Sequence, residues 1–231
     1  MTKQQFDHAK NILQVIAENK KLTDENYSKQ GAEKLGAKIW SVLNPYITQN
    51  ISTYKNWDKQ DYDTRERFIS DVLNLLIENF PNNKNTKPKI YFKEQIKSIW
   101  PKNIVEPSAL FYSPTLSPWA NDMVKNATGN NEPFFAFFHD LSRFGILEQI
   151  VHEFTHYLQS IGQSSIPYTA VQKAADYYQF YYADKEKNKQ IYIDSIHEVE
   201  ARTIAAHIHE QMKQLMTNNN LILTKDNNYI K

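Results

Sequence analysis

Two histidines and a glutamate stand at a spacing that can bind and use a metal ion. They lie in His152-Glu153-Phe154-Thr155-His156, an H-E-x-x-H pattern. Positions i and i+4 of a helix share one face, a single turn apart, so the imidazoles of His152 and His156 can hold one Zn²⁺ between them. Glu153 follows the first histidine and can take a proton from a water molecule on that metal. The pattern therefore predicts a metal centre with Glu153 as general base.

An apolar helix is expected to carry this pattern. In the stretch Ile146–Gly162, apolar residues recur at helical spacing and no proline interrupts them. Gly162 is placed as a C-terminal stop. The alternative is a pair of exposed histidines on an amphipathic helix without a metal. His152 and His156 lie beside the apolar stripe, however, and half-buried imidazoles are costly without a partner, which favours the metal.

A third protein ligand is expected to come from a later helix. A zinc site that keeps one position open takes three protein ligands, and a chain without cysteine must supply histidine or carboxylate. Gln159 and Gly162 stand where a three-histidine motif of the form H-E-x-x-H-x-x-G-x-x-H would have glycine and histidine. The best remaining stretch is Ser195–Ala206.

Glu198 and Glu200 compete for this third position. Glu198 lies three residues after Ser195, the spacing of a capping box, which would give its carboxylate a local role at the helix start. A helical wheel puts Glu198 on the side of Arg202, a solvated face, and Glu200 on the side of Ile204, toward the apolar arc. A buried carboxylate needs a partner and a metal supplies one. We therefore expect Glu200 as the third ligand, with Glu198 as the alternative.

The elements that must position these residues follow from periodicity. Apolar spacing of three and four residues predicts further helices at Lys3–Lys20, Asn26–Asn50, Asp61–Phe80, Thr169–Ala183 and Ser195–Met216. Apolar runs bounded by prolines predict strands at Lys89–Ile96, Ala109–Leu116 and Phe134–Phe138, the last of them buried on both faces.

Local signals predict where these elements stop. Thr23-Asp24-Glu25 indicates a break with a new helix cap, and Pro45 indicates an end or a kink. Asn121–Glu132, rich in asparagine and glycine, indicates a loop. The tail Leu221–Lys231 is expected to be a short strand or disordered.

Composition excludes some classes of function. A chain of 231 residues, 41% of them hydrophobic, can form one or two domains with a sizeable core. A formal net charge of +1 gives no electrostatic reason to expect nucleic acid. No run approaches the ~18 apolar residues of a membrane span, and the N-terminal stretch lacks the apolar centre of a signal peptide. We expect no membrane span and, by default, a cytoplasmic protein; export by a route without an N-terminal signal stays open.

The pattern His152-Glu153-x-x-His156 followed by Glu200-Ala201 resembles the gluzincin division of the zincin metallopeptidases. The resemblance implies an α+β, zincin-like fold with N-terminal helices, a small mixed sheet, the H-E-x-x-H helix and a C-terminal glutamate helix. Many gluzincins carry an acid one turn after the glutamate ligand, where this chain has Ile204 after Glu200 and Arg202 after Glu198.

The resemblance covers roughly Asp61–Met216, and the helical stretch Lys3–Asn50 has no counterpart in it, so we expect an organisation into three parts. An N-terminal helical region at residues 1–57 would precede a metallopeptidase domain at residues 58–217, and a tail would follow at residues 218–231.

An activity is implied as well, that of a zinc-dependent endopeptidase acting on a peptide or protein. His152, His156 and Glu200 would hold Zn²⁺, Glu153 would be the base, and an extended peptide would lie along Ala109–Leu116. Three residues are candidates to stabilise the oxyanion: Tyr168, Tyr192 and His197. His197 can equally be a core histidine with all its hydrogen bonds made.

Two other functions stay open. The same fold can serve as a regulatory or binding module that keeps the metal without proteolysis, or the motif can be accidental in a helical structural protein. Metal content separates the last from the others.

Overall fold

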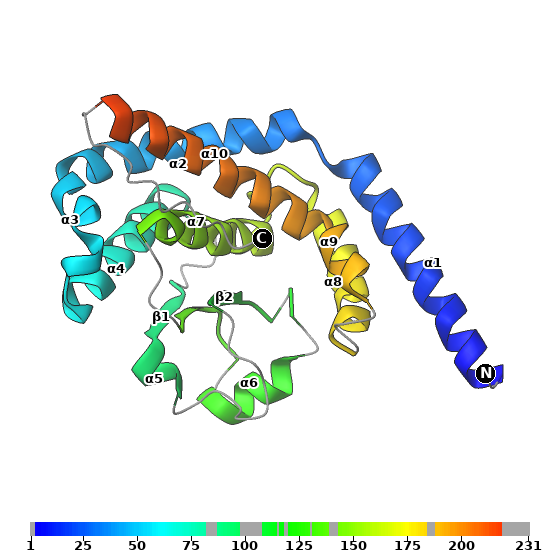
Figure 1. The fold of residues 1–231 in the computed structure, drawn as a ribbon. Coiled ribbons are helices and arrows are strands. Elements are labelled where there is room, and N and C mark those ends of the chain that lie inside the picture. The colour runs from blue at the N-terminus through cyan, green and yellow to red at the C-terminus, as the bar shows by residue number, and fades with distance from the viewer. Residues whose placement is uncertain are drawn as a thin grey trace.

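The structure of the chain is a computed structural model. It describes residues 3–81, 87–97, 108–114, 116–117, 120–129, 131–138, 143–183 and 188–218. Helices form most of it, and a three-stranded sheet lies below them in the view of Figure 1. The predicted class is confirmed: an α+β chain with N-terminal helices, a small mixed sheet, the histidine helix and a C-terminal glutamate helix.

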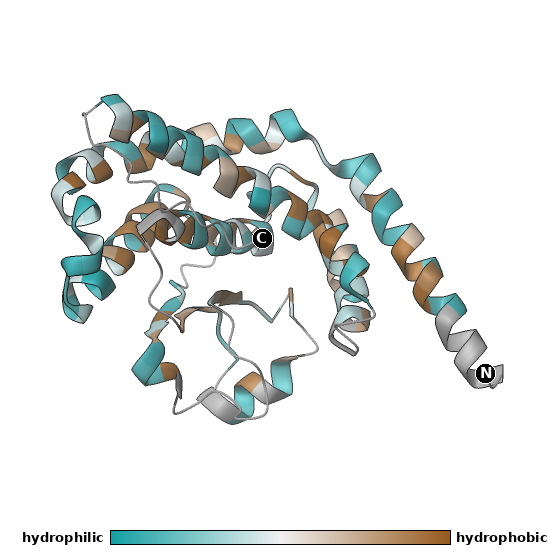
Figure 2. Ribbon diagram, in the orientation of Figure 1, coloured by the Kyte–Doolittle hydropathy of each residue, from teal (hydrophilic) through white to brown (hydrophobic). Residues whose placement is uncertain are grey.

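The first third of the chain is helical. Its elements are α1 (Lys3–Asn26), α2 (Lys29–Gln49), α3 (Ile51–Lys55), the short 3₁₀ helix η1 (Trp57–Lys59) and α4 (Tyr62–Asn79). Ser28 caps α2 by accepting a hydrogen bond from the N–H of Gly31, and Asp61 caps α4 through the N–H of Thr64. Caps of this kind contribute about 1 kcal/mol each, and the apolar faces behind them are visible as brown segments in Figure 2.

One predicted helix break is wrong, and of the two outcomes left open at Pro45, an end or a kink, the end does not occur. The break at Thr23-Asp24-Glu25 is absent: α1 continues to Asn26, because Leu22 packs in a buried cluster with later helices and holds this turn in place. Pro45 does not end α2 either, which continues to Gln49. Proline lacks the backbone N–H that would bond within the helix. The buried side chains on both sides of it, Ile39, Leu43 and Ile47, nevertheless pack α2 against the core.

The sheet has the order β1-β3-β2, with β1 (Lys89–Phe92) parallel to β3 and β2 (Ala109–Tyr112) antiparallel to it. The central strand β3 (Phe134–Phe137) is buried at every position, as predicted. Phe135 and Phe137 join the main core under the helices, whereas Phe134 and Ala136 join a separate cluster on the opposite face. Both faces of the sheet are therefore covered.

The predicted strands are too long, and one predicted loop is a helix. Only the first half of Lys89–Ile96 is a strand, because α5 (Lys93–Lys97) follows it; Ala109–Leu116 likewise ends as a strand at Tyr112. The segment predicted as a loop contains α6 (Asn121–Thr128). Its asparagines and glycine lie at the helix ends, where Gly129 closes α6 with φ 77°.

The described residues after the sheet form four helices: α7 (Arg143–Ser160), α8 (Tyr168–Ala183), α9 (Lys189–Ile193) and α10 (Ile196–Asn218). Helix α10 packs along both α7 and α2. Small residues allow this approach: Ala201 is fully buried on α10, and an added Cβ at Gly36 of α2 would lie 3.1–3.3 Å from the side chain of His207.

Side chains of α1 bind the main chain around α9. The Asn19 amide donates to the Ile191 carbonyl at 2.8 Å, and the Thr23 hydroxyl donates to the Asp194 carbonyl. These bonds join the N-terminal helix to the segment that leads into α10.

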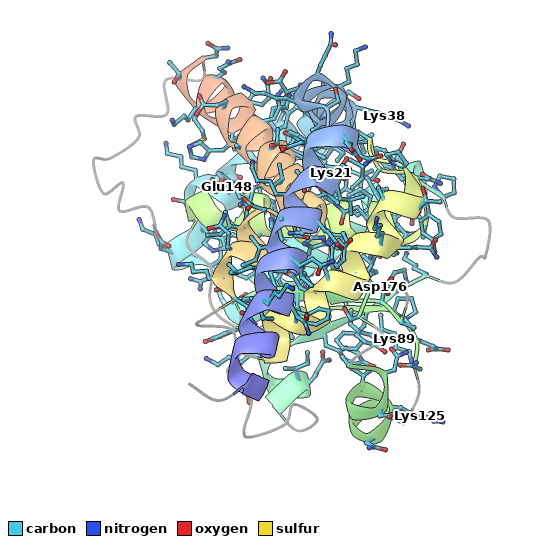
Figure 3. The ribbon with its side chains drawn as sticks, turned by 90° about the vertical axis from the view of Figure 1, so that its right-hand side faces the viewer. Lys21, Lys38, Lys89, Lys125, Glu148 and Asp176 are labelled. Atoms are coloured by element: carbon cyan, nitrogen blue, oxygen red, sulfur yellow. The ribbon has the colours of Figure 1, made fainter. Side chains whose placement is uncertain are left out.

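The main core runs across the predicted boundary at residue 57. It includes residues of α2 as well as of α4, α7 and α10. The division into residues 1–57, 58–217 and 218–231 stays a prediction, and the tail Leu221–Lys231 lies outside the described residues. None of the described helices combines the length and apolar content that crossing a bilayer requires. In Figure 3, Lys21 and Lys38 lie in the upper part of the molecule and Lys125 lies at its lower end.

The close crossing of α2 and α10 gives the first prediction. Gly36→Leu is expected to lower the free energy of unfolding by about 1–3 kcal/mol, the usual effect of overpacking, because His207 leaves no room for a side chain. Urea unfolding followed by circular dichroism measures this. Ala37→Leu, on the exposed side of the same helix, is the control; equal stability of the two variants would contradict the crossing.

Candidate metal centre

His152 and His156 lie one turn apart on α7, as the motif predicts. Their Nε2 atoms are 3.2 Å from each other, and the two rings are nearly perpendicular, at 84°. The side chains are 19% and 13% exposed. The two nitrogens therefore point at one small space that solvent can still reach.

Glu198 of α10 completes the cluster. Its carboxylate oxygens lie 3.4 Å from His152 Nε2 and 3.5 Å from His156 Nε2. One donor atom from each of the three residues lies within 4.8 Å of the other two. A tetrahedral zinc with bonds of about 2.0–2.1 Å separates its ligand atoms by about 3.3 Å. The two imidazole nitrogens, 3.2 Å apart, lie near that spacing, and each faces a different oxygen of the Glu198 carboxylate at 3.4–3.5 Å.

Glu200, the expected third ligand, is not among the three residues that converge here. The Glu200 carboxylate instead accepts hydrogen bonds from the N–H and hydroxyl of Ser165 and from the Gln159 amide. Glu200 is indeed buried, as the helical wheel indicated, but its partners are protein donors.

The wheel misplaced Glu198 because it describes one helix in isolation. Farther along α10 that face is solvated, but at the start of the helix α8 and α9 cover it, and Glu198 is only 5% exposed. Tyr178 of α8 donates a hydrogen bond to Glu198 Oε1 at 2.8 Å. The capping box is absent too, because the Ser195 hydroxyl pairs with His197 Nδ1.

Charge within the cluster is strongly coupled. Burial alone would raise the pKa of Glu198, but the adjacent imidazoles of His152 and His156 outweigh it and hold that pKa well below its usual range. Burial lowers the pKa of His156, and the contacts with Glu198 overcome this and raise it to about 9. Because a metal needs the free lone pair of a neutral imidazole, metal binding at this cluster is expected to compete with a proton on His156.

The donor atoms of these three residues are chemically suited to a zinc ion. Glu198 Oε2 is buried and has no hydrogen-bond partner, a costly state for a carboxylate oxygen. Two imidazole nitrogens and one carboxylate oxygen are ligands that Zn²⁺ prefers. A cation at this point would satisfy the unpaired oxygen.

Glu153 lies on the sheet side of α7 and is buried. Its Oε2 accepts a hydrogen bond from the N–H of Phe111 in β2 at 2.6 Å. Burial, with a smaller contribution from Glu198, raises the pKa of Glu153 against the lowering effect of His152, His156 and this hydrogen bond. The carboxylate is thus held by one oxygen at the edge of the sheet.

The three candidates for an oxyanion donor lie in different places. His197 is buried with both nitrogens engaged, Nδ1 by Ser195 and Nε2 by the Val171 carbonyl, so it is a core histidine here. Tyr168 is 38% exposed at the start of α8. Tyr192 on α9 lies at the cluster: burial and the charge and hydrogen bond of Glu198 raise its pKa well above the normal range.

Sequence reasoning missed two residues that hold the ligands. Gln159 follows His156 by three residues, a spacing that puts both on one helix face, and its side chain bonds to His156 Nδ1 at 2.8 Å. Tyr178 belongs to the aromatic run of α8, where nothing in the sequence distinguishes it from its neighbours.

Comparison of the chain with protein-family models, with curated protein sequences and with solved structures finds no match in any of the three. What stands is the geometry: a pair of histidines one turn apart and a glutamate from a later helix form a cluster that resembles the gluzincin ligand arrangement.

Metal binding at this cluster is expected to stabilise the fold. Zn²⁺ at 100 times its dissociation constant should raise the free energy of unfolding by about 2.7 kcal/mol, and a chelator should reverse the gain. His152→Ala and Glu198→Ala should lose the effect in thermal unfolding, whereas Glu210→Gln, on the exposed face of α10, should keep it. A wild-type response in Glu198→Ala would contradict the assignment of the third ligand.

Proposed function

We propose that the protein is a zinc-dependent peptidase that hydrolyses peptide bonds in a peptide or protein substrate. The convergence of His152, His156 and Glu198, with Glu153 beside the two histidines in the H-E-x-x-H pattern, supports this most strongly. The metal ligands proposed are the three converging residues, with Glu198 in the place first given to Glu200.

The ligand set favours hydrolysis because it would leave one coordination position of the metal open. Three protein ligands on zinc leave one position open, and zinc there supplies a Lewis acid that polarises a carbonyl and makes water more acidic. The histidines keep a path to solvent, since their side chains are 19% and 13% exposed.

Glu153 is proposed as the general base. Its Oε2 is fixed by the Phe111 N–H, so Oε1 is the atom that takes the proton from water and returns it to the leaving amine. A general base works best when its pKa approaches the working pH, and burial shifts the pKa of Glu153 upward, in that direction.

Strand β2 is proposed to align the substrate. It is an edge strand of the three-stranded sheet, and an extended peptide can add to such an edge through main-chain hydrogen bonds. The bond from Phe111 to Glu153 joins this edge to the base, which would fix the distance between a bound peptide and the reacting centre.

Removing the base should separate binding from catalysis. Glu153→Gln is expected to retain near-stoichiometric zinc by elemental analysis and to lower kcat for a fluorogenic peptide by a factor of about 10²–10⁴. His152→Ala should lose both. Unchanged cleavage by Glu153→Gln would remove the peptidase proposal, and full zinc in the wild type without cleavage of any peptide in a library would favour a binding module instead.

Tyr192 is proposed as the oxyanion donor, since its hydroxyl lies at Glu198. Tyr192→Phe should lower kcat by a factor of about 10²–10³ with little change in KM. Tyr168→Phe, at the exposed start of α8, is the matched control. Equal kinetics of the two variants would remove Tyr192 from this role.

A further inference from the structure

We propose that Gln159 and Glu200 are positioning residues that hold His156 with its Nε2 lone pair toward the metal. The inference rests on the proposed function and assigns a role to the carboxylate that the sequence favoured as a ligand. Neither residue offers a ligand atom to the metal position: Gln159 bonds to the far side of the His156 ring, and Glu200 acts through Gln159.

A continuous line of hydrogen bonds carries this proposal. His156 Nδ1 lies 2.8 Å from Gln159 Oε1, and Gln159 Nε2 lies 2.9 Å from Glu200 Oε2 and 3.0 Å from the His197 carbonyl. The other oxygen of Glu200 receives the N–H of Ser165 at 2.7 Å and its hydroxyl. Gln159 and Glu200 are both 0% exposed, so water does not compete with these bonds.

Glu200 determines which way the Gln159 amide points. The Glu200 carboxylate and the His197 carbonyl are both acceptors, and both face the same end of the amide. That end must be the NH₂ group, because a reversed amide would bring three oxygens together. The amide oxygen of Gln159 is therefore committed to the opposite side, toward His156.

The amide oxygen in turn selects the state of His156. Facing an acceptor, Nδ1 must carry a hydrogen. In the neutral ring, Nε2 then has the free lone pair, and Nε2 is the atom that faces His152 and Glu198. The arrangement is a carboxylate–amide–histidine line, in which an amide is inserted into the carboxylate–histidine pairing common beside zinc.

Ser165 anchors the line to the loop that follows α7. Its two donors fix Glu200 Oε1, and the loop begins at Gly162, whose φ of 73° turns the chain out of the helix. The start of α10, α7 and this loop therefore set the orientation of His156 together.

Single substitutions test whether the polarity of this line matters. Glu200→Gln removes one of the two acceptors that orient the Gln159 amide and leaves only the His197 carbonyl, and Gln159→Glu opposes two carboxylates. Each is expected to weaken zinc binding by a factor of about 10–100, measured by chelator competition on the full-length protein. Glu210→Gln, exposed on the same helix, is expected to bind like the wild type.

A double exchange separates polarity from packing. Gln159→Glu combined with Glu200→Gln swaps carboxylate and amide, so that His156 Nδ1–H again meets an acceptor and Ser165 again meets an oxygen. The bond to the His197 carbonyl is lost, and recovery to within about tenfold of wild-type affinity is expected. A merely structural role predicts that the double variant is worse than either single variant.

The outcomes are distinct. The inference is overturned if the single variants bind zinc within about twofold of the wild type, or if the double variant binds more weakly than both. The proposed function still stands in that case, provided that the wild type binds zinc and cleaves peptides. A wild type that takes up no zinc overturns both. Thermal unfolding of the metal-free proteins checks that each variant folds. If Glu200→Gln does not fold, Ser165→Ala is used instead: it removes one donor to Glu200 and is expected to weaken zinc binding about fivefold. Unchanged zinc affinity of Ser165→Ala would count against the proposal.

Discussion

A carboxylate buried among four helices is the constraint on which the rest of the structure depends. Glu198 is 5% exposed where α7, α8, α9 and α10 meet, and an isolated carboxylate in such a place would be very unfavourable. Two imidazoles, one tyrosine hydroxyl from α8 and the nearby hydroxyl of α9 surround it. Each neighbouring helix is thus tied to one charge, and the helices can pack closely only with these partners in place.

The surroundings of the cluster divide into two kinds of support. On one side, Gln159, Glu200 and Ser165 form a polar line without exposed members at its centre. On the other side, the Phe111 N–H of β2 holds Glu153. Side chains held by packing and by outer hydrogen bonds keep a productive geometry more accurately than side chains on free loops. The sheet is small, yet it supplies the contact that orients the proposed base.

The sequence predicts those parts of the fold that repeat locally. Helix α4 follows from its apolar spacing and the Asp61 cap, the fully buried β3 follows from its continuous apolar run, and the histidines of α7 follow from the motif. Errors arise where contacts with a neighbouring element determine which face of a helix is buried. The third ligand is one such case: which face of α10 is buried near Glu198 depends on α8 and α9 lying over it.

Length and termini of short elements are the other source of error. The apolar run at Lys89–Ile96 fits a strand or a strand followed by a helix turn, and periodicity over so few residues does not separate them. Asparagine and glycine near α6 signal turns whether they lie within a loop or at the ends of a helix. The line from Ser165 to His156 spans residues that no local pattern connects.

The hydrogen bonds from α1 to the segment around α9 have a consequence for sequence divergence among homologues. Asn19 and Thr23 bind carbonyl groups of the main chain, at Ile191 and Asp194. Every amino acid offers such a carbonyl, so an exposed side chain of α9 such as Ile193 can change without loosening this attachment. The donors on α1 have no such freedom. Homologous chains are therefore expected to vary at Ile193, which is 40% exposed, far more readily than at the two donor positions facing it.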